Sequence, residues 1–199
     1  SAITTGQAYG LEGISLSSPE EERRQKALER IKDHAHLAGT LDANAVIIIG
    51  SMRGTGANKD ARFLLRDALH EFAGEYPTIK FALEPLNRYE SSLINTVEEA
   101  LGMLDEVNLP NIGLLFDTFH ANIEERSFTE SIRSAAEKIF HVHVADSNRF
   151  VPGHGHLDFA EVGAALREIG YQGFCSLESL PKPNPEKCLD YAANFIGEL

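Results

Sequence analysis

The chain has 199 residues, 43% of them hydrophobic, and a formal net charge of −12 at pH 7. This length and composition are typical of one globular domain with a sizeable core. The negative charge argues against binding nucleic acid or an anionic membrane through bulk electrostatics, and no apolar run approaches the roughly 18 residues that a membrane span needs.

Six short apolar runs alternate with longer amphipathic stretches along the chain. Nearly continuous apolar runs of this length are typical of parallel strands that are buried on both faces. We therefore expect strands at residues 2–5, 45–50, 79–84, 112–117, 140–145 and 174–178. Cap residues indicate helix starts at Ser18, Asn58 or Asp60, Asn95, Ser127, Asp158 and Asn184. No linker or change of composition interrupts the pattern, which predicts one domain over residues 1–199.

The number of repeats limits the architecture to two forms. Six strand–helix units in 199 residues give about 33 residues per unit, which is the usual size. A closed (β/α)8 barrel needs eight units, or about 250 residues. We therefore expect either an open, doubly wound α/β sheet or a TIM-type barrel that lacks its first two βα units, with six parallel strands in this chain.

Four of the expected strands carry one possible metal ligand at or near the C-terminal end: Glu84, Asp117, His143 and Glu178. The C-terminal ends of parallel strands form the edge where barrels and open α/β sheets hold their active sites. Side chains from four different strands converge more easily when the sheet curves, which favours the barrel. Three carboxylates and one imidazole form an oxygen-rich set that suits Mn²⁺, Mg²⁺ or Co²⁺ better than a structural zinc ion.

Each of these residues also has a simpler interpretation. Glu84 could form a salt bridge with Arg88 or another base, and Asp117 could cap a helix or belong to a turn. His143 could be a core histidine, with His141 stacked below it on the same strand face. Without a cation, however, the carboxylates would repel one another, so we expect one divalent ion bound by all four residues.

Such an ion can act as a Lewis acid on a sugar carbonyl and its neighbouring hydroxyl. Glu84 and Glu178 lie on well-separated strands, where one can remove a proton from one face of the sugar and the other can return a proton to the opposite face. His120 and Arg149 are expected to hold substrate oxygens.

Two loops contain further residues with possible site chemistry. His154 and His156 lie in a Gly-rich turn and are expected to have loop or surface roles rather than to serve as extra ligands. Arg53, in a segment with two glycines, could contact a phosphate, although a role in a turn is the simpler interpretation. Whether the substrate carries a phosphate stays open.

Five motifs in a fixed order carry a family resemblance: Glu84-Pro85-Leu86-Asn87-Arg88-Tyr89-Glu90, Asp117-Thr118-Phe119-His120-Ala121-Asn122-Ile123-Glu124-Glu125, His141-Val142-His143 followed by Asn148-Arg149, Pro152-Gly153-His154-Gly155, and Glu178. Together they resemble the xylose-isomerase-like TIM-barrel superfamily of sugar isomerases and epimerases. Within it, the chain most resembles the ketose 3-epimerases of the D-tagatose and D-psicose type. The resemblance covers essentially the whole chain.

The resemblance implies one metal ion, Mn²⁺ before Mg²⁺ or Co²⁺, held by Glu84, Asp117, His143 and Glu178. It implies that Glu84 and Glu178 also exchange the substrate proton through a cis-enediolate. It places three residues on the substrate hydroxyls and carbonyl oxygen: Glu90, His120 and Arg149. It further implies two βα units before Ser1, so that we expect an N-terminally incomplete barrel in this chain.

Other functions fit parts of the pattern. Endonuclease IV, a DNA-repair enzyme of the same superfamily, has a similar Asp-x-x-His and C-terminal Glu pattern. Resemblance to that enzyme would imply three zinc ions and histidine ligands from early strands, whereas residues 1–5 contain no histidine. A non-catalytic metal- or sugar-binding relic fits an incomplete barrel. An inosose-type dehydratase is a further alternative.

The remaining expectations concern partners and location. The predicted partner is a small sugar, with neither nucleic acid nor membrane, and a homo-oligomer is expected because barrels of this kind often pair. Cys175, in a strand that looks buried, and Cys188, on a late helix, do not form a disulfide framework. Together with the lack of a recognisable signal peptide, they predict a cytoplasmic location.

Overall fold

The structure is a computed structural model that describes residues 2–41 and 45–195. Its six parallel strands form one sheet in sequence order, and every neighbouring pair is parallel. The strands are β1 (Ala2–Thr4), β2 (Val46–Ile49), β3 (Lys80–Leu83), β4 (Ile112–Asp117), β5 (Ile139–Val144) and β6 (Cys175–Leu177). Each lies within one residue of its predicted bounds.

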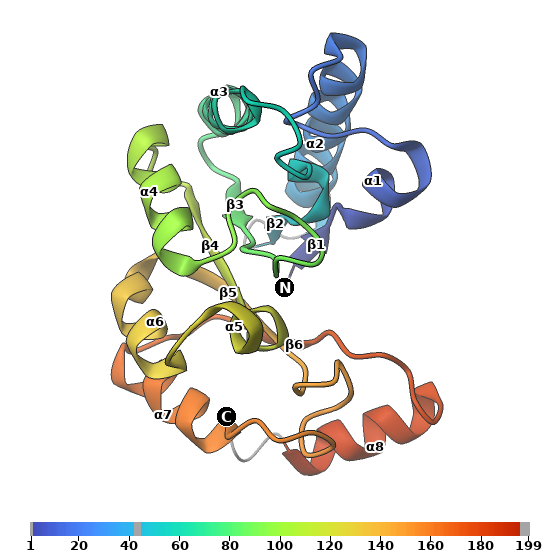
Figure 1. The fold of residues 1–199 in the computed structure, drawn as a ribbon, viewed down its shortest axis with the longest axis vertical. Helices are drawn as coiled ribbons and strands as arrows, with labels where there is room; N and C mark the ends of the chain where they lie inside the picture. Colours follow the sequence, from blue (N-terminus) through green and yellow to red (C-terminus); the bar gives the residue numbers. More distant parts are fainter. Residues whose placement is uncertain (1, 42–44, 196–199) are drawn as a thin grey trace.

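Helices connect the strands and cover one face of the sheet. They are α1 (Gly6–Glu12), α2 (Glu21–Leu41), α3 (Ala61–Glu75), α4 (Val97–Val107), α5 (Thr118–Glu124), α6 (Phe128–Ala135), α7 (Phe159–Glu168) and α8 (Pro185–Phe195), with 3-10 turns η1 (Ser51–Arg53) and η2 (Ala136–Lys138). Figure 1 shows α2, α3, α4, α6 and α7 in an arc outside the strands, with α1 and α8 at its two ends. None of the helices in the described residues is both long and apolar enough to span a membrane.

The alternation of side chains along the strands separates two apolar layers. Outward residues such as Ile47 and Phe81 join the large core shared with the helices. Inward residues form a small second cluster of Val46, Ile48, Ala82 and Leu115. A strand buried on both faces must be apolar throughout, which explains why the continuous runs identified the strands so closely.

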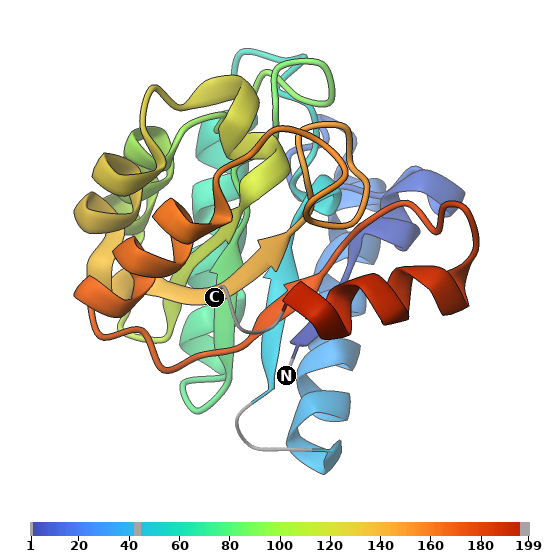
Figure 2. The same cartoon turned by 90° about the horizontal axis from the view of Figure 1, so that it is seen from below.

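The described sheet is curled, as predicted for a TIM-type barrel with six strands in this chain, and β1 and β6 are its edges (Figures 1 and 2). In Figure 2 the arrowheads of β2, in cyan, and β5, in orange, point toward the same end of the molecule. The loops at this end hold the residues discussed below.

The two cysteines lie in the C-terminal part of the chain. The expectation that Cys175 lies in a buried strand is wrong: Cys175 is exposed, because β6 pairs only with β5 in the described sheet. Cys188 is buried on α8.

The helix starts agree less closely than the strands. Ser127 and Asp158 cap α6 and α7 as predicted, each accepting a hydrogen bond from a backbone N–H in the first turn. The start predicted at Ser18 is wrong, because α2 begins at Glu21. The carbonyl of Ser18 accepts a hydrogen bond from the Arg24 guanidinium at 2.7 Å, and its hydroxyl accepts one from the Glu20 N–H, so this segment forms a turn before the helix.

The cap of α4 is displaced by one residue from the predicted Asn95. Thr96 accepts a hydrogen bond from the Glu99 N–H and forms a capping box with that residue. The Asn95 amide instead donates to the carbonyls of Leu86 and Ser91 at 2.6 and 2.7 Å. Asn95 therefore closes the loop between β3 and α4, and the next residue takes the role of the cap.

Candidate metal centre

Four ligand-type side chains from four neighbouring strands meet at the C-terminal edge of the sheet. Glu84 follows β3, Asp117 ends β4, His143 lies on β5 and Glu178 follows β6. One potential ligand atom from each of them lies within 4.8 Å of the others. In a flat sheet β3 and β6 would be about 14 Å apart, three strand spacings of about 4.8 Å. The curvature of the sheet and the inward direction of the side chains thus bring together the residues that the sequence spacing singled out.

His143 is the centre of this cluster. Its Nδ1 lies 3.0 Å from Glu178 Oε2 and 3.8 Å from both Glu84 Oε1 and Asp117 Oδ2. Below it, the ring of His141 packs edge-to-face at 5.2 Å and contacts the Ser176 hydroxyl, as expected for a stacked core histidine.

The charges of the cluster are unbalanced without a cation. Burial lowers the pKa of His143, but contacts with Glu178 and Glu84 outweigh this effect and raise it to about 10. Burial, together with the charges of Glu84 and Glu178, raises the pKa of Asp117 well above its ordinary value despite the neighbouring Arg149. Burial also acts to raise the pKa of Glu178, but His143 and Arg149 bring it down to about 2. The carboxylates thus hold a proton on the imidazole, which stands in for missing positive charge.

The buried polar atoms of the cluster fit a hard divalent ion. Glu84 Oε1 and His143 Nδ1 form no hydrogen bond of normal geometry, although buried polar atoms normally do; around His143 Nδ1 lie the carboxylates of the cluster itself. Asp117 Oδ1 accepts hydrogen bonds from the first N–H groups of α5, which fixes the carboxylate. Three carboxylates and one imidazole nitrogen are the donor types that Mn²⁺ and Mg²⁺ take in proteins.

Gly50, directly after β2, makes room for the Glu84 carboxylate. A Cβ atom at this position would overlap Glu84 Oε2. The absence of a side chain therefore allows Glu84 to lie inside the curve of the sheet, and Gly50 belongs to the construction of the site even though it offers no ligand atom.

A cavity of about 370 Å³ opens over the ligands. It is lined by Glu84, His143 and Glu178 together with the three predicted substrate residues Glu90, His120 and Arg149, and also by Thr4, Thr5, Gly6, Gln7, Ile48, Gly50, Ser51 and Leu86. Sequence reasoning missed the residues from the ends of β1 and β2, although the rule that sites lie at strand C-termini would have included them. A cavity of similar size lies near Tyr9 and Asn58, and the described residues that line it include no such group of potential ligands. Cavity volume alone therefore does not identify the site.

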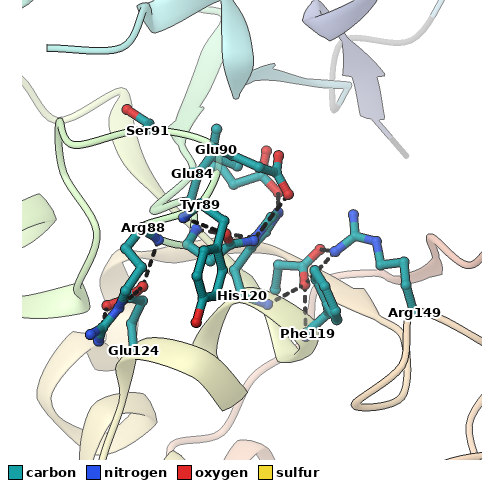
Figure 3. A network of polar contacts seen from close by, with 12 residues as sticks. Glu84, Arg88, Tyr89, Glu90, Ser91, Phe119, His120, Glu124 and Arg149 are labelled. Atoms are coloured by element: carbon teal, nitrogen blue, oxygen red, sulfur yellow. Dashed lines mark hydrogen bonds and ion pairs between the residues drawn. The ribbon is translucent and has the colours of Figure 1, made fainter. Parts of the chain in front are cut away.

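Arg149 connects the cavity to two of the ligands. Its guanidinium donates to both oxygens of Asp117 at 3.1 Å and to Glu178 Oε2. The guanidinium lies over the Phe119 ring, 4.7 Å from its centroid. Figure 3 shows Arg149 beside Phe119, reaching toward the carboxylates.

His120 and Glu90 meet in a second polar network at the cavity wall (Figure 3). Asn87, between them, donates from its backbone N–H to His120 Nδ1 at 3.2 Å and from its side-chain amide to Glu90 Oε1 at 3.0 Å. Burial and the charge of Arg149 lower the pKa of His120 to about 3, so the ring is neutral at ordinary pH.

The other residues considered from the sequence lie outside the cluster. Arg88 pairs with Glu124 at 2.8 Å, which contradicts the predicted alternative of a salt bridge between Arg88 and Glu84. His156 contacts the Ser147 hydroxyl, and His154 packs against a tyrosine ring, so both have loop roles as expected.

Arg53 ends the 3-10 turn η1, in agreement with the favoured interpretation, and its side chain is fully buried. Its guanidinium donates to the backbone carbonyls of Glu84 and Ile94, the latter at 2.9 Å. It thus joins the beginning and the end of the loop that carries Glu90.

Comparison with known proteins places this geometry in a family. Residues 2–199 match the protein family that is described as "Xylose isomerase-like TIM barrel". A D-psicose 3-epimerase from Enterocloster bolteae is 44% identical over 100 residues, which cover 50% of this chain and 33% of that protein. A probable ketose 3-epimerase from Synechocystis is 30% identical over 190 residues, which cover 87% of this chain and 66% of that protein. The chain thus spans only part of the length of these relatives.

A solved structure gives the same result. The crystal structure of D-psicose 3-epimerase with D-tagatose from Clostridium cellulolyticum H10 has a TM-score of 0.83 and 28% sequence identity, and the match covers 92% of this chain and 72% of that one. The resemblance drawn from the motifs is therefore confirmed. The chain belongs to the xylose isomerase-like TIM-barrel family.

Proposed function

We propose that this chain carries the metal-binding and proton-transfer part of a sugar epimerase of the ketose 3-epimerase type. The observation that supports this most strongly is the convergence of Glu84, Asp117, His143 and Glu178, of which all but Asp117 line a polar cavity. The epimerase names of the similar proteins support the same reaction class.

The four residues would hold one divalent ion, and we propose Mn²⁺, with Mg²⁺ or Co²⁺ as alternatives. When bound, the ion would supply Lewis-acid polarisation of the ketose carbonyl and the adjacent hydroxyl, which acidifies the C–H bond between them.

Glu84 and Glu178 would move the proton. One carboxylate takes the proton from carbon three, the C–H electron pair forms the C2–C3 double bond of a cis-enediolate, and the carbonyl oxygen takes the negative charge. The other carboxyl, in its protonated form, returns a proton to the opposite face, and the two groups then exchange one proton with each other or with water. The buried Oε1 of Glu84 forms no hydrogen bond, and Glu84 and Glu178 both line the cavity, which supports carboxyl groups placed to exchange a proton with the substrate.

Glu90, His120 and Arg149 would hold the substrate oxygens. All three line the cavity beside the ligands. Arg149 supplies donors in a fixed fork for a carbonyl or enediolate oxygen, and the neutral His120 supplies one N–H donor. Holding the oxygens in place lowers the barrier by orienting the C–H bond toward the base.

The test is isotope exchange. The purified protein with Mn²⁺ is incubated with a ketose in deuterated water, and NMR is used to follow deuterium at carbon three. We expect exchange in the parent protein and in the surface control Glu137→Gln, and none in Glu84→Gln or Glu178→Gln. Tight Mn²⁺ binding without exchange at any carbon would instead identify a non-catalytic sugar- or metal-binding protein.

Two further parts of the proposal concern the protein as a whole. Cys175 and Cys188 are both free thiols, which supports a reducing, cytoplasmic location. A homo-oligomer stays a prediction that light scattering on the purified protein tests.

A further inference from the structure

Asn87 lies buried in the loop after β3, next to two of the residues that we propose for substrate binding. Its amide orientation is fixed, because the Tyr89 N–H donates to Oδ1 at 3.0 Å. The NH2 group must therefore point the other way, where it donates to Glu90 Oε1 at 3.0 Å and lies 2.8 Å from His120 Nδ1. One side chain thus joins the carboxylate and the imidazole.

The same residue determines which nitrogen of His120 carries the proton. The backbone N–H of Asn87 also donates to Nδ1, at 3.2 Å. With two donor groups facing it, Nδ1 must be the acceptor, and in a neutral imidazole the proton then lies on Nε2. Nε2 lies 3.9 Å from Glu84 Oε1, on the side of the ring that faces the ligands.

Glu90 needs such support more than its neighbours do. Its side chain is 47% exposed, whereas those of His120 and Glu84 are 4% and 7% exposed. An exposed glutamate samples several rotamers, and fixing one of them costs conformational entropy at the moment of binding. The hydrogen bond from Asn87 restricts that freedom before the substrate arrives. Figure 3 shows the carboxylates of Glu90 and Glu84 close together, on the same side as His120.

We propose that Asn87 is a positioning residue that presents His120 as an Nε2–H donor and Glu90 as an acceptor to the same substrate. A hydroxyl group both donates and accepts a hydrogen bond, so an N–H donor and a carboxylate that line the same cavity are complementary to the oxygens of one sugar. The sugar as ligand rests on the proposed function, whereas the arrangement of the three side chains does not.

The first test does not require turnover. Histidine ¹⁵N shifts in the metal-free protein distinguish the two neutral tautomers, and the signal that is lost in His120→Gln identifies the residue. We expect the Nε2–H form in the parent protein. Either the Nδ1–H form or the doubly protonated ring would overturn the proposal, and no variant of Asn87 has to fold for this result to be obtained.

The second test compares Asn87→Asp with Asn108→Asp, the same chemical change in an exposed cap of α4. In Asn87→Asp a carboxylate oxygen faces His120 Nδ1 and repels Glu90, so we expect the Nε2–H signature to weaken and kcat/KM to fall about 10- to 100-fold. Mn²⁺ affinity should not weaken, because Asn87 contacts none of the four ligands in the described network.

The outcomes separate the two claims. An unchanged tautomer and unchanged kcat/KM in Asn87→Asp would refute the positioning role. A parent protein that shows the expected tautomer but turns over no ketose would refute the proposed function and leave the arrangement around Asn87 intact.

Discussion

Removal of the metal should lower the melting temperature by a predictable amount. A ligand that binds only the folded state at 100 times its Kd stabilises that state by about 2.7 kcal/mol. For 199 residues, an unfolding entropy of roughly 2.1 cal/mol/K per residue gives about 0.4 kcal/mol/K. The expected difference between the metal-loaded and the metal-free protein is therefore about 6 °C.

The shift in melting temperature should depend on the four proposed ligand residues. The proposed ligands lie at the ends of β3, β4, β5 and β6, so one bound ion would connect four of the six described strands and remove the repulsion among three carboxylates. Differential scanning calorimetry with and without a chelator, followed by Mn²⁺ titration, measures the shift. We expect Asp117→Asn to abolish it and Glu137→Gln to leave it unchanged. A shift that persists in Asp117→Asn, or no shift in the parent protein, would refute the reasoning.

Three further predictions follow from single residues. The pKa of His143 is about 10 in the folded protein, compared with about 6.5 in the unfolded chain, so the ring is protonated at pH 7.5 without metal. Its ion pairs therefore stabilise the metal-free protein fully below pH 6.5, and this stabilisation is lost as the pH rises through 10. Metal binding should therefore release about one proton from this ring, which calorimetry in buffers of different ionisation enthalpy would detect as a buffer-dependent heat; a buffer-independent heat would contradict the assignment. Gly50→Ala should weaken Mn²⁺ binding about 10- to 100-fold, because the new methyl group displaces the Glu84 carboxylate; unchanged affinity in a competition titration would show that the carboxylate does not need this space. Arg53→Met should lower the free energy of unfolding by about 1–3 kcal/mol, because the backbone carbonyls of Glu84 and Ile94 both lose a donor; an unchanged urea midpoint would exclude such a role for the guanidinium.

The strand bounds could be predicted closely because a strand that is buried on both faces is a continuous run of apolar residues in the sequence. Residues 112–117 are apolar up to the final Asp117, and their bounds agree with the prediction at both ends. The convergence of the four proposed ligands could be predicted for a related reason, since a polar residue at the end of such a run lies at the edge of the sheet. Helix starts were less predictable because capping side chains have competing partners, as Asn95 shows by donating to two loop carbonyls.

The supporting residues of the site could not be predicted from local pattern. Asn87 contacts His120, and Arg53 contacts Glu84 and Ile94, which lie 31 to 41 positions away in the chain. Nothing in the periodicity of the sequence around them indicates these partners. The role of Gly50 also becomes clear only when the structure places Glu84 beside it, because a glycine at the end of a strand can have several different structural causes.

The central claim is that Glu84, Asp117, His143 and Glu178 bind one divalent ion together. Anomalous diffraction from crystals grown with Mn²⁺ tests it most directly. The account predicts one manganese peak per chain in the cavity, within bonding distance of a carboxylate oxygen from each of the three acidic residues and of Nδ1 of His143. A peak elsewhere, or a peak from which any of the four side chains turns away, would contradict it.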